Sequence, residues 1–342
     1  MSMKTSMSAI VCAQYGQPHD LRLATVQTPV LADNEVRIQV AVAGINFPDS
    51  LIIKGEYQVK PPLPFTPGFE VTGKVIETGP TVTNIAVGQR VMALASKGYG
   101  AFAEEVAANA HEVVPIPNGL DYHSAAALFV AYGTAFHALV QRANLQAGET
   151  LVVLGASGGV GLAAVELGKA LGANVIAVCR THQRALPAQT KGADHVIAYD
   201  DEDIRNGVLQ ATDGRGADVC IDMLGGQAFH AMSRSMNWGG RLLIVGFTSG
   251  EIPQLSMNLP LLKGYQVIGV YWGQFLARSP DLNEQNFRAL ATLIDTGKIT
   301  PHIAGRYPLT RVPDALTALL SREVAGKLLI DVTGQQEVMH AS

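Results

Sequence analysis

The sequence predicts a two-domain α/β protein in which a doubly wound parallel sheet is inserted into a β-rich domain. The pattern of strand, helix and turn signals along the chain predicts this organisation, because short β segments separated by Gly and Pro run to about residue 128. Strands and helices then alternate as far as residue 272, and mixed segments return beyond it. We therefore assign residues 1–130 and 273–342 to the β-rich domain and residues 131–272 to the inserted domain.

The composition is that of a globular protein large enough for two hydrophobic cores. The chain has 342 residues, of which 48% are hydrophobic and 16% charged. Its net charge is −4 and it shows no basic stripe, so nucleic acid is excluded as an expected partner. The N-terminus has no apolar signal core, and no apolar run approaches the length of a membrane span. We expect a cytoplasmic protein without membrane contact.

The three cysteines support the same compartment. Cys12, Cys179 and Cys220 are far apart and match neither a zinc-binding spacing nor a disulfide framework. Isolated cysteines of this kind are typical of a reducing environment.

Strand signals dominate the first 128 residues. Residues 36–42 alternate apolar and polar side chains, which is the period of a half-buried strand. Residues 69–77 and 89–95 are further strand candidates. Turn signals such as Pro61-Pro62, Pro67-Gly68 and Gly79-Pro80 separate them.

Alternating strands and helices follow. Residues 124–140 are a helix candidate with Ser124 as its expected N-cap. The alternation continues through residues 151–154, 159–171, 174–178, 188–192, 195–197, 219–221 and 242–245. Beyond residue 272 we expect a helix at 283–296, a strand at 328–332 and a disordered tail from 334 to 342. Short apolar strands in repeated βα units predict a parallel sheet with both faces covered.

The most specific motif is a glycine-rich loop between the strand at 151–154 and the helix at 159–171. It consists of Gly155, Ala156, Ser157, Gly158, Gly159, Val160 and Gly161. With a second strand at the right distance, this context is that of a Rossmann dinucleotide-binding loop. Ala156 and Gly158 let the backbone approach a pyrophosphate, and Gly161 lets the helix pack closely on the strand. The N–H groups and dipole of the helix N-terminus then face the phosphates.

The end of the second strand indicates which dinucleotide binds. Cys179 and Arg180 stand where NAD enzymes usually carry an Asp or Glu that binds the ribose 2′-hydroxyl, and Arg184 follows four residues on. A guanidinium in place of the acid favours a 2′-phosphate. Two charged hydrogen bonds of ~1.5–3 kcal/mol each correspond to a preference of very roughly 10²–10⁴-fold. The sequence therefore predicts NADPH as the cofactor.

Several further motifs carry a family resemblance. The stretches from Gly44 to Asp49, Gly55 to Tyr57 and Pro67 to Glu70 resemble the medium-chain dehydrogenase/reductase superfamily, and within it the zinc-free quinone oxidoreductases and their quinone oxidoreductase-like branch. Residues 130–135, 222–226 and 271–273 fit the same pattern. The resemblance covers nearly the whole chain and implies a GroES-like fold for the β-rich domain. It also implies a homodimer joined by Rossmann edge strands, for which residues 267–271 are the candidate.

Metal chemistry is not expected. Zinc-dependent relatives in this superfamily hold the metal with a Cys and a His, but this sequence has Asn46 and Phe69 at those positions. Neither side chain replaces a thiolate or an imidazole on zinc. Without a Lewis acid, the easier reaction is hydride delivery to an acceptor that is already electrophilic.

The resemblance also implies a set of site residues. Asn46, Asp49 and Tyr57 line the pocket beside the nicotinamide, where Asn46 could hydrogen-bond a substrate oxygen and Tyr57 could do so or donate a proton. The same resemblance places further residues around the cofactor: Thr134, Phe247, Tyr271 and Trp272 near its nicotinamide half, Tyr199 and Arg322 near its 2′-phosphate, and Asn258 and Lys327 elsewhere along it.

The leading expectation is therefore an NADPH:quinone oxidoreductase that acts on a small-molecule quinone without metal. A second enzyme reaction fits the same residues, namely NADPH-dependent reduction of enals, enones or enoyl thioesters. A different class of protein, a non-catalytic, crystallin-like NADPH-binding protein, is the third possibility. The glycine loop together with Asn46 and Tyr57 favours an enzyme over that third possibility.

Overall fold

The structure is a computed structural model that describes residues 5–332 and divides into two compact units. We call the first, which comprises the chain up to Val130 and from His302 onward, the catalytic unit. The second, Ala131–Pro301, is the Rossmann unit. The expected disordered tail at 334–342 lies outside the described residues.

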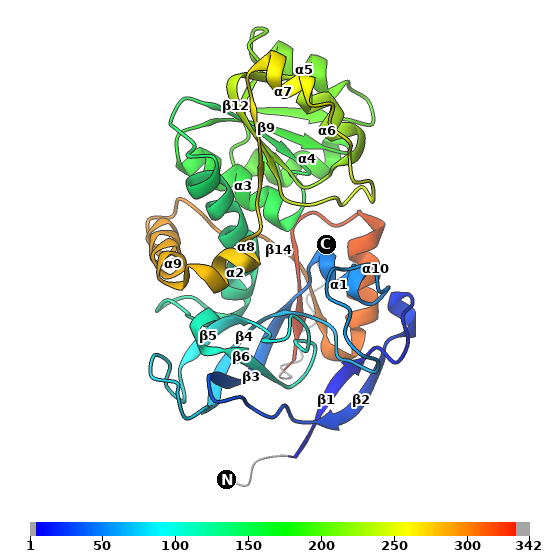
Figure 1. Cartoon of the computed structure of the whole chain (residues 1–342), viewed down its shortest axis with the longest axis vertical. Coiled ribbons are helices and arrows are strands. Elements are labelled where there is room, and N and C mark those ends of the chain that lie inside the picture. The colour runs from blue at the N-terminus through cyan, green and yellow to red at the C-terminus, as the bar shows by residue number, and fades with distance from the viewer. Residues whose placement is uncertain (1–4, 333–342) are drawn as a thin grey trace. The chain divides into compact units, whose positions relative to one another are not determined.

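The catalytic unit is built around a sheet in the order β14-β15-β3-β4-β5-β7, with β6 also paired to β3. Its strands are β3 (Glu35–Gly44), β4 (Glu70–Thr78), β5 (Arg90–Leu94), β6 (Glu105–Asn109), β7 (Val114–Pro115), β14 (Ile303–Pro308) and β15 (Lys327–Asp331). A separate antiparallel pair consists of β1 (Ser6–Val11) and β2 (Arg22–Gln27). The helices are α1 (Phe47–Ile52) and α10 (Val312–Ser321) (Figure 1).

Strand β3 holds this unit together because it lies between β15 and β4 and also pairs with β6. The expected alternation is present, since Val36, Ile38 and Val40 are fully buried. Antiparallel register opposes Gly44 of β3 to Leu329 of β15 on one side and to Glu70 of β4 on the other. The ends of three neighbouring strands therefore meet at Gly44.

The Rossmann unit has a six-stranded parallel sheet in the order β10-β9-β8-β11-β12-β13. Its strands are β8 (Thr150–Leu154), β9 (Asn174–Cys179), β10 (His195–Ala198), β11 (Ala217–Asp222), β12 (Met236–Ile244) and β13 (Gln266–Gly269). If these six strands are numbered 1 to 6 from β8 to β13, their order across the sheet is 3-2-1-4-5-6. This is the arrangement of dinucleotide-binding domains. The predicted fold class, a Rossmann sheet inserted into a GroES-like unit, is confirmed.

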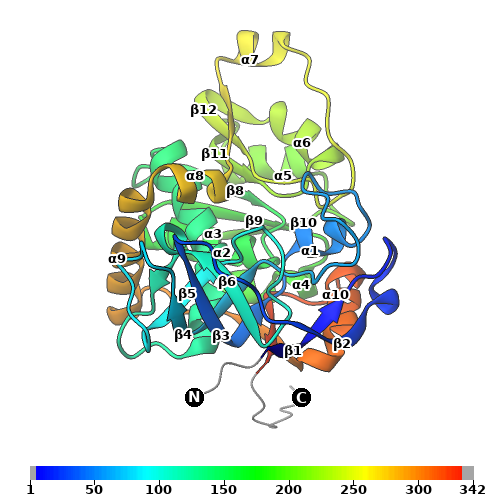
Figure 2. The same cartoon turned by 60° about the horizontal axis from the view of Figure 1, so that its bottom comes forward.

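Helices cover both faces of this sheet. The connecting helices are α3 (Gly159–Ala170), α4 (His182–Thr190), α5 (Ile204–Ala211) and α6 (Gly226–Ser233). Because α3 contacts α4 while α5 contacts α6, the four form two separate layers. A short helix, α7 (Asn258–Lys263), projects beyond β12 before the chain enters the edge strand β13 (Figure 2).

One boundary differs from the expected domain division. Residues 273–301, expected in the β-rich domain, belong to the Rossmann unit. They form α8 (Trp272–Arg278) and α9 (Pro280–Asp295), which pack on the helical segment that opens the unit. Phe275 stacks on His137 with ring centroids 4.0 Å apart, and Gln141 donates a hydrogen bond to Asn286 at 2.8 Å. A change of texture in the sequence does not reveal such packing.

The expected helix at 124–140 begins and ends differently. It starts as α2 (Tyr122–Phe136) and continues as a π-helix, His137–Arg142. Ser124 is not its N-cap, because the Asp121 carboxylate accepts the Ser124 N–H at 2.7 Å and therefore stands at the capping position. Contrary to expectation, the segment Tyr122–Arg142 is long and apolar enough to cross a membrane by length and composition. Most of its residues are buried within the protein, as those of a core helix are.

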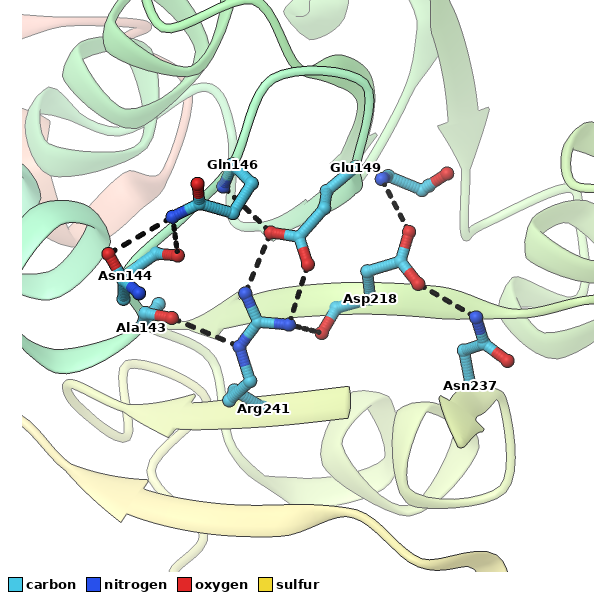
Figure 3. Close-up of polar contacts among 8 residues, drawn as sticks. Ala143, Asn144, Gln146, Glu149, Asp218, Asn237 and Arg241 are labelled. Atoms are coloured by element: carbon cyan, nitrogen blue, oxygen red, sulfur yellow. Dashed lines mark hydrogen bonds and ion pairs between the residues drawn. The ribbon is translucent and has the colours of Figure 1, made fainter. Parts of the chain in front are cut away.

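A polar network links the amino ends of β8 and β11 to the neighbouring strand β12 (Figure 3). Arg241 of β12 binds both carboxylate oxygens of Glu149, at 2.7 and 2.8 Å, and donates to the Ala143 carbonyl at 3.0 Å. Asp218 of β11 accepts the N–H of Thr150 and the side-chain amide of Asn237. Burial alone would raise the pKa of Glu149, but hydrogen bonds from Arg241 and the Gln146 N–H lower it.

Replacing Arg241 by leucine should destabilise the protein, because it leaves the half-buried Glu149 without its partner. We expect a loss of about 2–4 kcal/mol in the free energy of unfolding at pH 7, measured by chemical denaturation. The lowered pKa of Glu149 makes the interaction fully present above the unfolded-state value of about 4.3 and lost as pH falls further. The difference between the two proteins should therefore shrink below about pH 4.

Arg288→Leu is the matched control, since Arg288 forms an exposed pair with Glu284 one helical turn away. Its cost should stay below about 0.5 kcal/mol. Equal losses in the two variants would show that the Arg241 network contributes no more than a surface ion pair.

Candidate functional site

A buried polar cluster lies where the ends of β15, β3 and β4 meet in the catalytic unit. Lys327 opens β15, Glu70 opens β4, and Asn46 follows β3 immediately before α1. Glu70 is fully buried and Lys327 is 4% exposed. Charges so deeply buried require compensating partners.

The three side chains form a closed triangle. The Lys327 ammonium donates to Glu70 Oε2 at 2.5 Å and to Asn46 Oδ1 at 2.6 Å, and Asn46 Nδ2 donates to Glu70 Oε2 at 2.8 Å. The second Glu70 oxygen accepts the Val130 N–H at 2.9 Å. A Cβ at Gly44 would stand 2.2 Å from Glu70 Oε2, so the triangle closes only over a glycine.

This geometry constrains what Asn46 can do. Its Nδ2 donates to Glu70 and, at 3.3 Å, to the Gly44 carbonyl, so both of its amide hydrogens are used. The predicted hydrogen bond from Asn46 to a substrate oxygen therefore requires exchange of the long bond to Gly44. In the arrangement described, Asn46 acts first as the link between a buried cation and a buried anion.

Asp49 lies beside this triangle, in the first turn of α1. Its Oδ2 accepts the Asn46 N–H at 2.7 Å, and its Oδ1 is buried without a hydrogen-bond partner. Burial raises the pKa of Asp49 to about 8, although the hydrogen bond from Asn46 and the charge of Lys327 oppose the shift. Asp49 is therefore mainly protonated at neutral pH. Tyr57 follows α1 in the chain, is half-buried and packs against the hydrophobic core of this unit.

The glycine loop of the Rossmann unit has the geometry that a dinucleotide needs. Gly155 has φ +80°, and both Gly155 and Ala156 donate their N–H groups to the Val178 carbonyl. A Cβ at Gly161 would lie 2.2 Å from the Gly155 oxygen, so only glycine permits this close approach of helix and strand. No side chain caps the N-terminus of α3 at Gly158. Its first N–H groups therefore suit a pyrophosphate.

The predicted 2′-phosphate residues of this unit come together at the ends of β9 and β10. Arg180 follows β9, and Tyr199 donates its N–H to the Cys179 carbonyl at 3.0 Å. Burial raises the pKa of the Cys179 thiol to about 11, and the nearby charge of Arg184 partly offsets the shift. The Arg180 guanidinium donates to Asp200 Oδ2 at 2.9 Å. No sequence motif indicates this carboxylate.

Three more residues of the predicted cofactor site belong to the same unit. Thr134 is a mostly buried residue of α2, and the Trp272 ring covers its neighbour Gly133, where a Cβ would lie 2.7 Å from the indole. Trp272 donates to Asn283 at 3.2 Å, and Tyr271 beside it is 50% exposed. These positions are consistent with the predicted contacts of the three side chains with the nicotinamide half of the cofactor.

The remaining predicted residues are spread more widely. Phe247 packs on Gly225, where a Cβ would lie 2.9 Å from its ring, and Asn258 opens α7. Arg322 and Lys327 belong to the catalytic unit, so their approach to the cofactor stays a prediction. Lys327 is already engaged in the triangle, a role that the sequence analysis missed together with Glu70. The only signal for Glu70 was an acid at the opening of a predicted strand, within the motif Gly68-Phe69-Glu70.

Comparisons with known proteins cover both units. The model of the alcohol dehydrogenase GroES-like domain matches residues 32–118, and that of the zinc-binding dehydrogenase matches residues 159–294. In residues 5–332, no group of three or more His, Cys, Asp or Glu side chains could hold a metal ion. The name of the second family model therefore does not by itself assign zinc to this chain.

Three proteins that match nearly the whole chain all carry the name of an oxidoreductase or of an oxidoreductase-like protein. A quinone oxidoreductase-like protein 2 homolog from Nematostella vectensis is 37% identical over 96% of this chain and 90% of its own length. A probable oxidoreductase from Mycobacterium abscessus is 36% identical, with a TM-score of 0.85, 96% of this chain and 99% of that one being covered. The Escherichia coli quinone oxidoreductase complexed with NADPH is 27% identical, with a TM-score of 0.88 and coverage of 95% and 100%. The chain therefore belongs to the quinone oxidoreductase family of the medium-chain dehydrogenase/reductase superfamily.

Proposed function

We propose that this chain is an NADPH-dependent oxidoreductase that delivers hydride to a quinone without a metal. The observation that carries the proposal is the position of the Lys327 ammonium, which lies 2.5 Å from Glu70 Oε2 and 2.6 Å from Asn46 Oδ1. A cation thus already neutralises the buried carboxylate beside the residue that replaces a zinc-binding cysteine. A zinc ion there would have to displace that ammonium and use an amide and a carboxylate without a thiolate or imidazole.

The cofactor of this enzyme is NADPH. The Rossmann unit fits it, because the glycine loop leaves the N-terminus of α3 uncapped, Arg180 directly follows β9 and Arg184 lies in the first turn of α4. The Escherichia coli relative was solved with NADPH, which supports the same assignment. When bound, NADPH supplies the hydride, so the protein has to position the acceptor and provide protons.

The catalytic unit supplies a fixed electrostatic frame for that task. Asn46 is held rigidly because both ends of its amide bind charged groups, Lys327 and Glu70. Asp49, whose pKa is raised to about 8, holds a proton at neutral pH one hydrogen bond away from the Asn46 backbone. We propose Asn46, Asp49 and Tyr57 as the pocket residues, with Lys327 and Glu70 positioning Asn46.

A second copy of the chain is the proposed partner. The outer edge of β13 pairs with no strand in residues 5–332, so its backbone groups can accept another strand. Exposed apolar side chains surround this edge, and we call them the edge patch: Trp238, Leu261, Leu262 and Val267. We propose a homodimer that covers this patch and joins two β13 strands, and a cytoplasmic location, consistent with three buried free cysteines.

Light scattering at micromolar concentration should therefore give the mass of two chains. Val267→Lys places a charge within the proposed interface and should shift the protein towards one chain. Val87→Lys adds the same charge at another exposed valine, in the catalytic unit, and should leave the mass unchanged. A purely monomeric wild-type protein would contradict the proposal.

The reaction itself is tested by following NADPH oxidation with a benzoquinone, a naphthoquinone, a short enal and an enoyl thioester. We expect the largest kcat/KM with a quinone, no stoichiometric zinc by elemental analysis, and full activity after treatment with chelators. Turnover confined to the enal or thioester would assign the other electrophile class. About one zinc per chain together with loss of activity in chelator would refute metal independence, and no turnover at all would favour a non-catalytic binding protein.

The cofactor preference is tested with the double variant Arg180→Ala with Arg184→Ala. Removing two guanidinium groups should raise KM for NADPH about a hundredfold and change KM for NADH little. The value of kcat should stay nearly constant, because the 2′-phosphate contributes the same binding energy in the ground state and in the transition state. Arg234→Ala with Arg288→Ala removes two exposed arginines elsewhere in the Rossmann unit and serves as the charge-matched control. Retention of the NADPH preference in the first variant would assign the discrimination to other residues, with Tyr199 and Arg322 the next candidates.

A further inference from the structure

The end of β10 brings an acid to the predicted 2′-phosphate site. Parallel pairing of β9 with β10 runs from His195 opposite Ile176 to Ala198 opposite Cys179. Beyond the strands, the Asp200 N–H donates to the Arg180 carbonyl at 3.1 Å, so the two residues remain side by side. The acid that NAD enzymes carry at the end of the second strand is absent here, and a carboxylate stands on the neighbouring strand instead.

The side chains of these two residues are paired as well. Arg180 Nε donates to Asp200 Oδ2 at 2.9 Å, and the two side chains are 51% and 38% exposed. The hydrogen bond and charge of Asp200 raise the pKa of Arg180. A phosphate monoester, which carries up to two negative charges at neutral pH, therefore meets an arginine that already has an anionic partner.

We propose that Asp200 is a specificity-determining residue, which competes with the 2′-phosphate of NADPH for Arg180 and so lowers the preference for NADPH over NADH. The inference rests on the proposed function, since it assumes that Arg180 receives the 2′-phosphate. An isosteric amide in place of Asp200 still offers Arg180 an acceptor but carries no charge, so it weakens the competition for the guanidinium and also removes repulsion between carboxylate and phosphate. An acid at position 200 thus reduces the difference in affinity between NADPH and NADH. A neutral residue there increases that difference.

The size of the effect follows from the exposure of the pair. Exposed ion pairs are weak, so weakening this one should change the affinity only severalfold, and lost repulsion adds to the gain. We therefore expect Asp200→Asn to tighten binding of 2′,5′-ADP by about threefold to tenfold. Because the interaction is exposed, the gain should largely disappear in ~0.5 M salt.

The experiment is isothermal titration of the full chain with 2′,5′-ADP and with 5′-AMP, which lacks the 2′-phosphate. Asp200→Asn should change the affinity for 5′-AMP by less than about twofold. Asp201→Asn is the matched control, because it removes the same charge from the adjacent exposed residue and should change neither affinity by more than about twofold. In steady-state assays, Asp200→Asn should lower KM for NADPH and leave kcat unchanged.

A second pair of proteins separates direct competition from a general effect of charge. In an Arg180→Ala background, Asp200→Asn should keep only the smaller part of its gain in affinity for 2′,5′-ADP, the part that comes from lost repulsion, because the shared partner is gone. An equal gain in that background would overturn the proposal, and so would unchanged or weaker 2′,5′-ADP binding by Asp200→Asn alone. Weaker binding would mean that Asp200 holds Arg180 in place for the phosphate.

These outcomes are distinguishable from failure of the proposed NADPH preference. If the wild-type chain and Asp200→Asn both bind 2′,5′-ADP no better than 5′-AMP, Arg180 is not a phosphate site and both proposals fail. If the wild-type chain prefers 2′,5′-ADP and Asp200→Asn does not increase that preference, only the role of Asp200 fails.

Discussion

The ion pair between Lys327 and Glu70 is the constraint on which the catalytic unit depends. Burying two charges in a protein core is costly, and only close pairing and complete hydrogen bonding offset that cost. Here the pair is 2.5 Å long, Asn46 joins both partners, and the Val130 N–H occupies the remaining Glu70 oxygen. Loss of either charge would leave the other buried without an ionic partner. The pair therefore fixes the relative positions of β15, β4 and the turn that opens α1.

This pair is also the feature on which the proposed metal independence rests, in a fold shared with zinc enzymes. A lysine ammonium is a compact cation that forms directed hydrogen bonds with oxygen atoms. Beside the carboxyl end of β3, the Lys327 ammonium neutralises Glu70, but it offers no open coordination position to a substrate. The site therefore provides fixed charge and shape, while the electrophilic character has to come from the acceptor. The proposed quinone acceptor, which is already electrophilic, meets that requirement, whereas an alcohol does not.

The fold could be predicted from the sequence because its signals are local. Short apolar strands, the spacing of the glycine loop and the strand after it identify the Rossmann sheet, and every expected strand overlaps an observed one. Features that depend on contacts between distant residues were missed. Residues 273–301 join the Rossmann unit through packing on residues 137–141, and Asp121 replaces Ser124 as the cap because only its carboxylate reaches the N–H groups. For the same reason the sequence indicated Arg180 and Lys327 but not their partners Asp200 and Glu70.

The residue that fits at position 44 depends on the residues at positions 70 and 327. Even the methyl group of alanine would stand 2.2 Å from Glu70 Oε2 and 3.0 Å from the Lys327 side chain. A larger residue at position 44 is thus compatible only with a different pair at positions 70 and 327. A substitution at position 44 is therefore disfavoured as long as the pair between Glu70 and Lys327 is kept. Among descendants of a common ancestor that retain this pair, position 44 should remain glycine.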